Sequence, residues 1–400
     1  MTAIPSILRT SQSKPQSASK SQPWHSYLTL DLIITVLSRT LFHPFIACLL
    51  PLCLRALAAP YNSTSFVVTF AFAFLVCIYH VWMIIDTRIA YGPPRLMDWE
   101  KEIVVITGGG QGLGACIAEI YSLRSVAVAV IDIAVPQEQD GTEVEGIWYY
   151  RCDIKHYENV EETWKRIVKA VGTPTILING AAFVKASRLT ETHFEDVHNV
   201  FRVNTLAHFQ LAQCFLKRLL KRKVGGTIVT VASVLGQLGA ANLTAYAASK
   251  GALLAYHASL SAELAITTPQ IKTILVAPGQ LDTPLFGEVQ VQGWLQNFVG
   301  PVVGAGELAV KIVEMVDKGQ GGEVRIPAYA RWIIPWMGVL SPGLQMTLRQ
   351  WSGVDNVMSH VGRQEMEKKD NTQHSEEANS ETSNSGDDSV GDANSERSSA

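Results

Sequence analysis

Two side chains in the second half of the chain, Tyr246 and Lys250, have the types and the spacing for acid–base chemistry. They are four residues apart, so on a helix they would share one face. A free tyrosine has a pKa of about 10 and transfers protons poorly at neutral pH, but a neighbouring ammonium group lowers this pKa. Ser233 follows an apolar run, and its hydroxyl can hold a substrate oxygen at the same place. Asn204 lies in a predicted helix and can supply a backbone or water link that feeds protons to Lys250.

A cluster of glycines at residues 107–114 reads Thr-Gly-Gly-Gly-Gln-Gly-Leu-Gly. It stands between an apolar run typical of a strand and an apolar run typical of a helix. Glycines at such a turn let backbone N–H groups approach a pyrophosphate, and the helix N-terminus adds partial positive charge. A plain tight turn is the alternative. The residues expected to line a dinucleotide here are Gly108, Gly110, Gln111, Gly112, Leu113 and Gly114.

The identity of the dinucleotide depends on Asp132, which ends the next predicted strand. A carboxylate there can accept hydrogen bonds from the adenosine ribose hydroxyls and would repel a 2′-phosphate. Neither Gln111 nor Ile133 is a basic residue that would offset this repulsion. The sequence therefore predicts NAD, with NADP as the alternative cofactor. Asp153, followed by Ile154, can accept a hydrogen bond from the adenine amino group.

Apolar runs rich in β-formers alternate with helical patterns between residues 98 and 327. The runs are nearly continuous, as expected for parallel strands that are covered on both faces. The alternation predicts an α/β fold with a Rossmann-like, doubly wound parallel sheet. The predicted strands are residues 103–107, 126–131, 147–152, 176–179, 227–232 and 271–277, and the longest predicted helices are 195–222 and 246–265.

A Tyr–Lys pair alone is weak evidence, because the spacing is common on helix surfaces. Combined with the glycine turn and Pro278-Gly279 in this order, however, it resembles the short-chain dehydrogenase/reductase family over residues 102–327. The resemblance implies that Tyr246 is the general acid/base of an oxidoreductase acting on CH–OH groups. It also implies that Lys250 lowers the pKa of Tyr246 and binds the nicotinamide ribose, that Ser233 orients the substrate carbonyl, and that Asn204 sustains a proton relay.

The resemblance extends to three further cofactor residues. It implies that Leu281 and Thr283 hold the nicotinamide amide, and that Asn179 lies beside the cofactor at the end of the fourth strand. One departure from the family pattern matters, because relatives have Asn-Asn-Ala-Gly where this chain has Asn179-Gly180-Ala181-Ala182. The missing amide at Gly180 puts the rigidity of the central strand in doubt.

The N-terminal region is predicted to bind a membrane. Residues 65–85 carry no formal charge, and about 20 apolar residues match the hydrocarbon thickness of a bilayer. A buried core helix is the alternative. Residues 28–57 contain Asp31 and Arg39, so they form either a second span, a re-entrant segment or an interfacial helix. Positive charges on both flanks, including Arg88 and Arg95, favour a hairpin with both ends in the cytosol.

Composition sets the remaining expectations. The chain of 400 residues has a net charge of −3, so it has no basic excess for nucleic acid, and its six cysteines show no metal or disulfide spacing. We expect a disordered arm at 1–27, a membrane anchor at 28–97, a catalytic domain at 98–327, a hydrophobic extension at 328–363 and a disordered acidic tail at 364–400.

The anchor and the hydrophobic extension resemble membrane-bound members of the family, such as retinol dehydrogenases and 17β-hydroxysteroid dehydrogenases. This implies a lipophilic alcohol or carbonyl substrate (a retinoid, a steroid or a long-chain lipid), contact with membrane lipid, and a place on the endoplasmic reticulum or on lipid droplets. Apolar residues at 284–303 fall where relatives have a substrate loop. Relatives also suggest a homodimer. The alternative is a membrane or droplet-surface protein that binds NAD(H) without efficient turnover and acts through partners.

Overall fold

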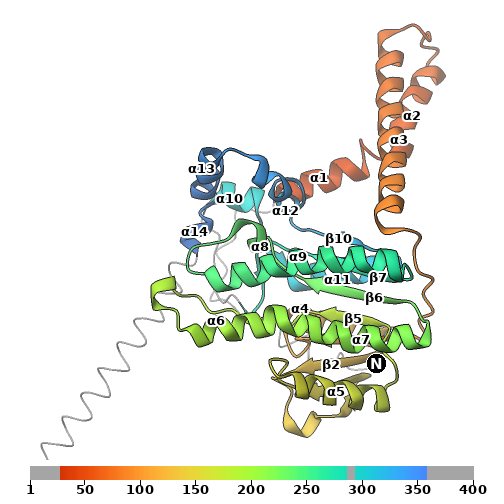
Figure 1. Ribbon diagram of the computed structural model, residues 1–400. Coiled ribbons are helices and arrows are strands. Elements are labelled where there is room, and N and C mark those ends of the chain that lie inside the picture. Colours follow the sequence, from red (N-terminus) through yellow and green to blue (C-terminus); the bar gives the residue numbers. More distant parts are fainter. Residues whose placement is uncertain (1–27, 286–292, 358–400) are drawn as a thin grey trace, which may run out of the picture.

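A sheet of eight strands organises the α/β part of the protein (Figure 1). The structure is a computed structural model, and it describes residues 28–285 and 293–357. The expected arm at 1–27, the tail at 364–400 and part of the 284–303 segment lie outside these residues. The strand order is β10-β7-β6-β5-β1-β2-β4-β3, and every neighbouring pair is parallel except β3 with β4. The strands are β1 Ile103–Thr107, β2 Ala127–Asp132, β3 Thr142–Val144, β4 Ile147–Arg151, β5 Ile176–Asn179, β6 Gly226–Val231, β7 Ile271–Val276 and β10 Gly322–Val324.

Helices cover both faces of this sheet, which explains why its strands are apolar on both sides. Side chains of β1 alternate between two buried clusters: Val104 and Ile106 belong to one cluster, and Val105 belongs to the other. The first cluster contains residues of α4 (Gly112–Leu123) and α11 (Ala305–Asp317). The second contains residues of α5 (Tyr157–Ala170), α7 (Ala207–Arg222) and α9 (Thr244–Thr267). The predicted doubly wound α/β fold is confirmed.

The long helix expected at 195–222 is not uniform. It consists of α6 (Phe194–Phe201) and α7 with a π-helical turn, Arg202–Leu206, between them. Asn204 lies in this turn, fully buried. Its side chain bonds the backbone of Phe183 in both directions, as acceptor at 2.7 Å and as donor at 2.9 Å. Single π turns of this kind occur often at functional sites.

Three helices precede the sheet: α1 (Leu30–Arg39), α2 (Pro44–Ala56) and α3 (Thr64–Tyr91). Among the described residues, α3 alone is long and apolar enough to cross a membrane, and α1 with α2 would pass the same test only as a pair bent by 54°. Ala47 of α2 packs against Ala73 and Val76 of α3. The two helices project from the catalytic domain as a hairpin (Figure 1).

The first helix is separate from this hairpin. α1 contacts α10 (Trp294–Val299) and α12 (Ala328–Trp332), and the Asp31 carboxylate accepts a hydrogen bond from the backbone N–H of Ala328 at 2.7 Å. α2 has 13 residues and a length of about 20 Å, which is less than the roughly 30 Å of a bilayer core. Residues 28–57 therefore combine a docked helix and a short apolar helix.

The hydrophobic extension after residue 327 is folded onto the domain. It contains α12, a 3₁₀ segment (Ile334–Val339), α13 (Pro342–Ser352) and α14 (Val354–Val357). Ala330, Ile334 and Met337 are buried against Val234, while Trp332 and Trp336 are exposed. One face of the extension thus packs on the domain, and the other face is exposed.

A buried ion pair fixes the linker between α3 and β1. Arg95 and Glu102 approach to 2.5 Å, and each side chain is 7% exposed. Thr175, in the loop before β5, also donates a hydrogen bond to Glu102. Arg95 therefore has a structural role in this ion pair. Of Arg88 and Arg95, the two positive charges that follow the predicted membrane segment, only Arg88 is exposed.

Replacing Glu102 by Ala should lower the free energy of unfolding by about 3 kcal/mol, because Arg95 would stay buried without a counter-charge. Denaturant unfolding of the full chain in detergent, followed by tryptophan fluorescence, measures this loss. The double variant Arg95→Met/Glu102→Leu removes both charges and should regain most of it. An unchanged midpoint for Glu102→Ala would contradict a structural role for the pair.

Candidate active site

Tyr246 and Lys250 lie one turn apart on α9 and are buried, with 3% and 2% of their surfaces exposed. A side-chain hydrogen bond joins Tyr246 to Ser233, which lies two residues after the end of β6. The Lys250 ammonium nitrogen lies 5.7 Å from the centre of the Tyr246 ring and donates to the carbonyl of Val231 at 2.9 Å. The structure therefore brings the three predicted side chains together at the carboxyl end of β6.

Burial acts on the two ionisable groups in opposite directions. It raises the pKa of the Tyr246 phenol, and the hydrogen bond with Ser233 lowers that pKa in part. Burial lowers the pKa of Lys250 to about 7. Both shifts favour the neutral forms. In this geometry the Lys250 nitrogen donates to the Val231 carbonyl. The lowering of the Tyr246 pKa by Lys250, expected from the sequence, stays a prediction.

Ser233 is fixed by a second contact. Its hydroxyl oxygen accepts a hydrogen bond from the backbone N–H of Leu235 at 3.2 Å, at the start of the short helix α8 (Leu235–Leu238). The residue is 6% exposed. A hydroxyl held from both sides in this way is positioned to meet a substrate oxygen together with the Tyr246 hydroxyl.

Asn204 reaches α9 through a residue that the sequence analysis missed. Its amide nitrogen donates to the Ser249 hydroxyl at 3.0 Å, and Ser249 donates to the backbone carbonyl of Tyr246 at 2.7 Å. With its other bonds committed to Phe183, the Asn204 side chain makes no hydrogen bond to Lys250, so a proton link would have to use its backbone carbonyl. Ser249 precedes Lys250 directly, but a serine on a helix gives no signal of such a partner.

The glycine turn joins β1 to α4. Gly108 has φ of 72°, and a side chain there would come within 2.6 Å of the Ala181 backbone. Gly114 lies against the Gly108 carbonyl, so the helix starts very close to the strand. Gln111 makes no side-chain capping bond to the first turn of α4. The N–H groups there are open to an anion, which fits the predicted dinucleotide pyrophosphate.

Asp132 lies directly beside this turn. Its carboxylate accepts hydrogen bonds from the backbone N–H groups of Gly110 and Ala134, each at 2.9 Å. The two strands that flank β1 are β2 and β5, so the strand order reverses at this point of the sheet. Ligands of open α/β sheets bind at such a reversal, outside the carboxyl ends of the strands.

Of the two predicted adenine residues, Asp153 lines an open groove and Ile154 does not. Asp153 accepts from the backbone N–H of Lys155 at 3.0 Å and lies 3.3 Å from its ammonium group, whereas Ile154 is buried in the core. A groove with a volume of about 510 Å³ is lined by Ile133 and Asp153. The distal end of a dinucleotide has room there.

Two further predicted cofactor residues surround the turn. Thr283 follows β8 (Leu281–Asp282), and its methyl group lies 3.6 Å from the position that a Cβ of Gly112 would take. Leu281 packs against the cluster that contains α4, and its strand pairs with β9 (Val303–Gly304). Leu113 belongs to the same cluster and is a packing residue.

Asn179 is the one predicted residue whose polar atoms are buried without a partner. It is 1% exposed, and neither its amide nitrogen nor its oxygen makes a hydrogen bond. Such groups are rare. This one belongs to the last residue of β5, which pairs with Thr107 at the start of the glycine turn. At the divergent Gly180, the Thr107 side chain bonds the N–H of Ala181 at 3.3 Å and Thr107 O accepts from Gly180 N–H at 3.1 Å. These bonds restrain the strand end where relatives use an asparagine.

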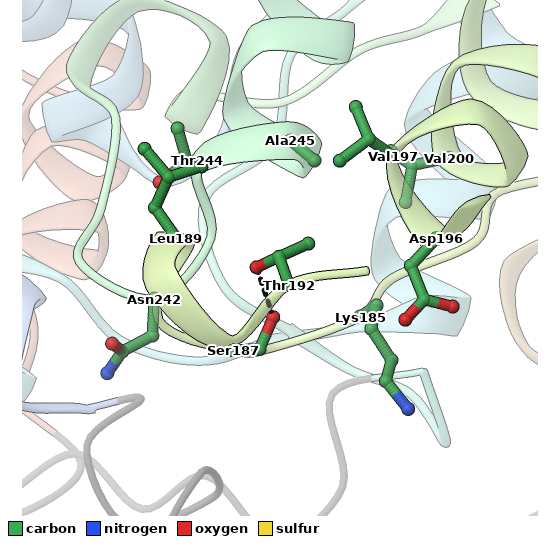
Figure 2. Close-up of a pocket in the computed structure, with 10 residues that line it drawn as sticks. All are labelled: Lys185, Ser187, Leu189, Thr192, Asp196, Val197, Val200, Asn242, Thr244 and Ala245. Atoms are coloured by element: carbon green, nitrogen blue, oxygen red, sulfur yellow. Dashed lines mark hydrogen bonds between the residues drawn. The ribbon is translucent and has the colours of Figure 1, made fainter. Parts of the chain in front are cut away.

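A second, much smaller pocket lies at the N-terminus of α9 (Figure 2). Thr192 and Ser187 are joined across it by a hydroxyl–hydroxyl bond of 2.6 Å. Its volume is about 10 Å³, enough for about one water molecule. Lys185 and Asp196 belong to its lining, but none of the predicted catalytic or cofactor residues does.

Comparison with known proteins agrees with this geometry. The family model for short chain dehydrogenases matches residues 102–293. The uncharacterized oxidoreductase YDL114W of Saccharomyces cerevisiae is 30% identical over 275 residues, which cover 68% of this chain and 87% of that protein. Retinol dehydrogenase 10 of Rattus norvegicus is 31% identical over 240 residues, covering 52% of this chain and 70% of that protein.

The fold is shared with a solved structure, a 4-hydroxyisoleucine dehydrogenase complexed with NADH. Its TM-score is 0.52 at 22% identity, and the match covers 56% of this chain and 97% of that one. The chain belongs to the short-chain dehydrogenase/reductase family and is an NAD(P)-dependent oxidoreductase that acts on alcohols.

Proposed function

We propose that this protein is a membrane-bound enzyme that interconverts a lipophilic alcohol and its carbonyl compound with NAD as the preferred cofactor. The observation that carries the catalytic part is the meeting of Ser233, Tyr246 and Lys250 at the carboxyl end of β6, the same edge of the parallel sheet at which the glycine turn follows β1. The bound cofactor would supply the hydride acceptor or donor at its nicotinamide ring. Gly108, Gly110 and Gly112 would face its pyrophosphate, Asp132 its ribose, and Leu281 and Thr283 its amide.

In this mechanism the protein holds the substrate and moves one proton. The Ser233 and Tyr246 hydroxyls both bond the substrate oxygen. During oxidation the Tyr246 oxygen takes the alcohol proton, and during reduction it returns a proton to the carbonyl oxygen. Because burial favours the protonated phenol, a charged Lys250 turned from Val231 toward Tyr246 would be needed for oxidation.

The membrane part of the proposal is supported by α3, which has 28 residues and a length of about 42 Å. Its side chains are mostly exposed and apolar, as in a helix surrounded by lipid. Positive charge on both flanks of this region favours a hairpin with both ends on the cytosolic side, in the endoplasmic reticulum or at a lipid droplet. The similarity to retinol dehydrogenase 10 supports an apolar alcohol as substrate. A homodimer remains part of the proposal as an expectation from relatives.

Replacing Tyr246 by Phe should lower turnover about 10²–10⁴-fold, because the proton transfer loses its acid/base group. Binding of NADH, followed by its fluorescence, should be retained. The assay uses NAD with a panel of retinoid, steroid and long-chain alcohols. Tight NADH binding without turnover of any of them by the unaltered protein would favour a non-catalytic role, and turnover that survives in Tyr246→Phe would exclude the proposed role of Tyr246.

Cofactor choice is tested at Asp132. The Asn variant keeps an acceptor for the Gly110 N–H group but loses the negative charge that repels a 2′-phosphate. The ratio of kcat/KM with NAD to kcat/KM with NADP should fall about fivefold, the effect of about 1 kcal/mol of charge repulsion near water. A ratio that stays constant would show that other groups set the preference.

A further inference from the structure

The C-terminal extension contains a run without charge. Residues 332–348 include no Asp, Glu, Lys or Arg, and Arg331 and Arg349 flank them. The exposed fractions of Trp332, Trp336 and Val339 are 51%, 65% and 77%. Large apolar side chains that gather on an exposed surface often mark a site that binds a protein, a ligand or a membrane.

Exposed apolar side chains of other helices extend this surface. In Figure 1, α1, α12 and α13 lie on the side of the sheet from which the α2–α3 hairpin projects. We define the platform as the exposed apolar side chains of these helices and of the 3₁₀ segment: Leu32, Val36, Trp332, Trp336, Val339, Leu344, Met346 and Trp351.

The platform is joined to the hairpin by α1. Residues 40–43 connect α1 to α2, and the two helix axes differ by 54°. The other side of α1 is held on the domain, where the Asp31 carboxylate bonds the N–H of Ala328 at the start of α12. α1 therefore links the hairpin to the platform along the chain.

Beneath the platform lies the segment that connects Ser233 to Tyr246. Val234 packs against Ala330, Ile334 and Met337. Arg349 donates to the Leu238 carbonyl and pairs with Asp355 at 2.6 Å. Asp355 in turn accepts from the N–H of Ala241 at 3.0 Å. The extension thus packs directly on the segment that follows the catalytic serine.

We propose that the platform docks on the leaflet that receives the hairpin, so that the catalytic domain lies against the lipid and the substrate enters from it. Three features favour lipid over a protein partner: continuity with the hairpin, the lack of charge in 332–348, and the exposed indole rings, which prefer the headgroup region. The Arg331 guanidinium lies 5.3 Å from the Trp332 ring, a pairing suited to the level of lipid phosphates. Entry of substrate from the leaflet rests on the catalytic part of the proposed function, whereas docking rests on its membrane part alone.

Fluorescence quenching by brominated lipid tests the docking. The full chain is reconstituted in phosphatidylcholine vesicles with and without dibrominated acyl chains. In the unaltered protein the platform tryptophans should be quenched, so Trp336→Phe and Trp332→Phe should each reduce the quenched share of the emission. Trp148→Phe on β4 is the matched control and should leave the quenched emission intact. Quenched emission that is the same in both platform variants and the unaltered protein would overturn the docking.

Kinetics test the route of the substrate. The double variant Trp332→Ser/Trp336→Ser should lower kcat/KM for a vesicle-embedded long-chain alcohol about tenfold relative to a short soluble alcohol, because contact with the leaflet is weakened. Ile266→Ser, an exposed apolar side chain at the far end of α9, is the control and should leave this ratio unchanged. A constant ratio in the double variant would reject entry from the leaflet. If the unaltered protein turns over neither alcohol, the proposed function fails, and quenching alone decides the docking.

Discussion

Burial of Tyr246 and Lys250 on one face of α9 is the constraint on which the site depends. Away from water both groups favour their neutral forms, so charge can exist there only where hydrogen bonds stabilise it. The partners in this structure, the Ser233 hydroxyl and the Val231 carbonyl, both come from the carboxyl end of β6. The acid–base chemistry is therefore controlled by the distance between one strand end and one helix.

That distance is set by packing on both sides of α9. Leu253, Leu260 and Leu264 of α9 are buried in the cluster that covers one face of the sheet. On the other side, Asn204 in the π turn bonds Ser249, and Thr205 bonds the Ser249 carbonyl at 3.1 Å. These bonds place α9 relative to the helix α6–α7, so the π turn positions the catalytic helix.

The sequence predicts local features well and distant contacts poorly. The six predicted strands appear with boundaries within one residue, because their apolar runs are set by burial on both faces. The three-residue strands β3 and β10 are too short to give a pattern. Three contacts were not predicted: Asn204 with Ser249, Asn204 with Phe183, and Asp31 with Ala328. Each joins residues that are between 21 and 297 positions apart, so no local sequence pattern indicates it. Likewise, spacing alone cannot show that Lys250 points to a carbonyl.

The same long-range contacts decide how the domain is held. One end of the hairpin is tied by α1, through Asp31 and Ala328, and the other by the linker after α3. There Lys272 donates to the Tyr91 carbonyl at 3.0 Å, and Arg95 pairs with Glu102 at the edge of β1. A domain on one flexible tether would turn freely against a membrane. The two attachments, one on each side of the hairpin, restrict rotation of the domain relative to the hairpin. Under our proposal they turn the face with the platform, under which Ser233 lies, toward the membrane.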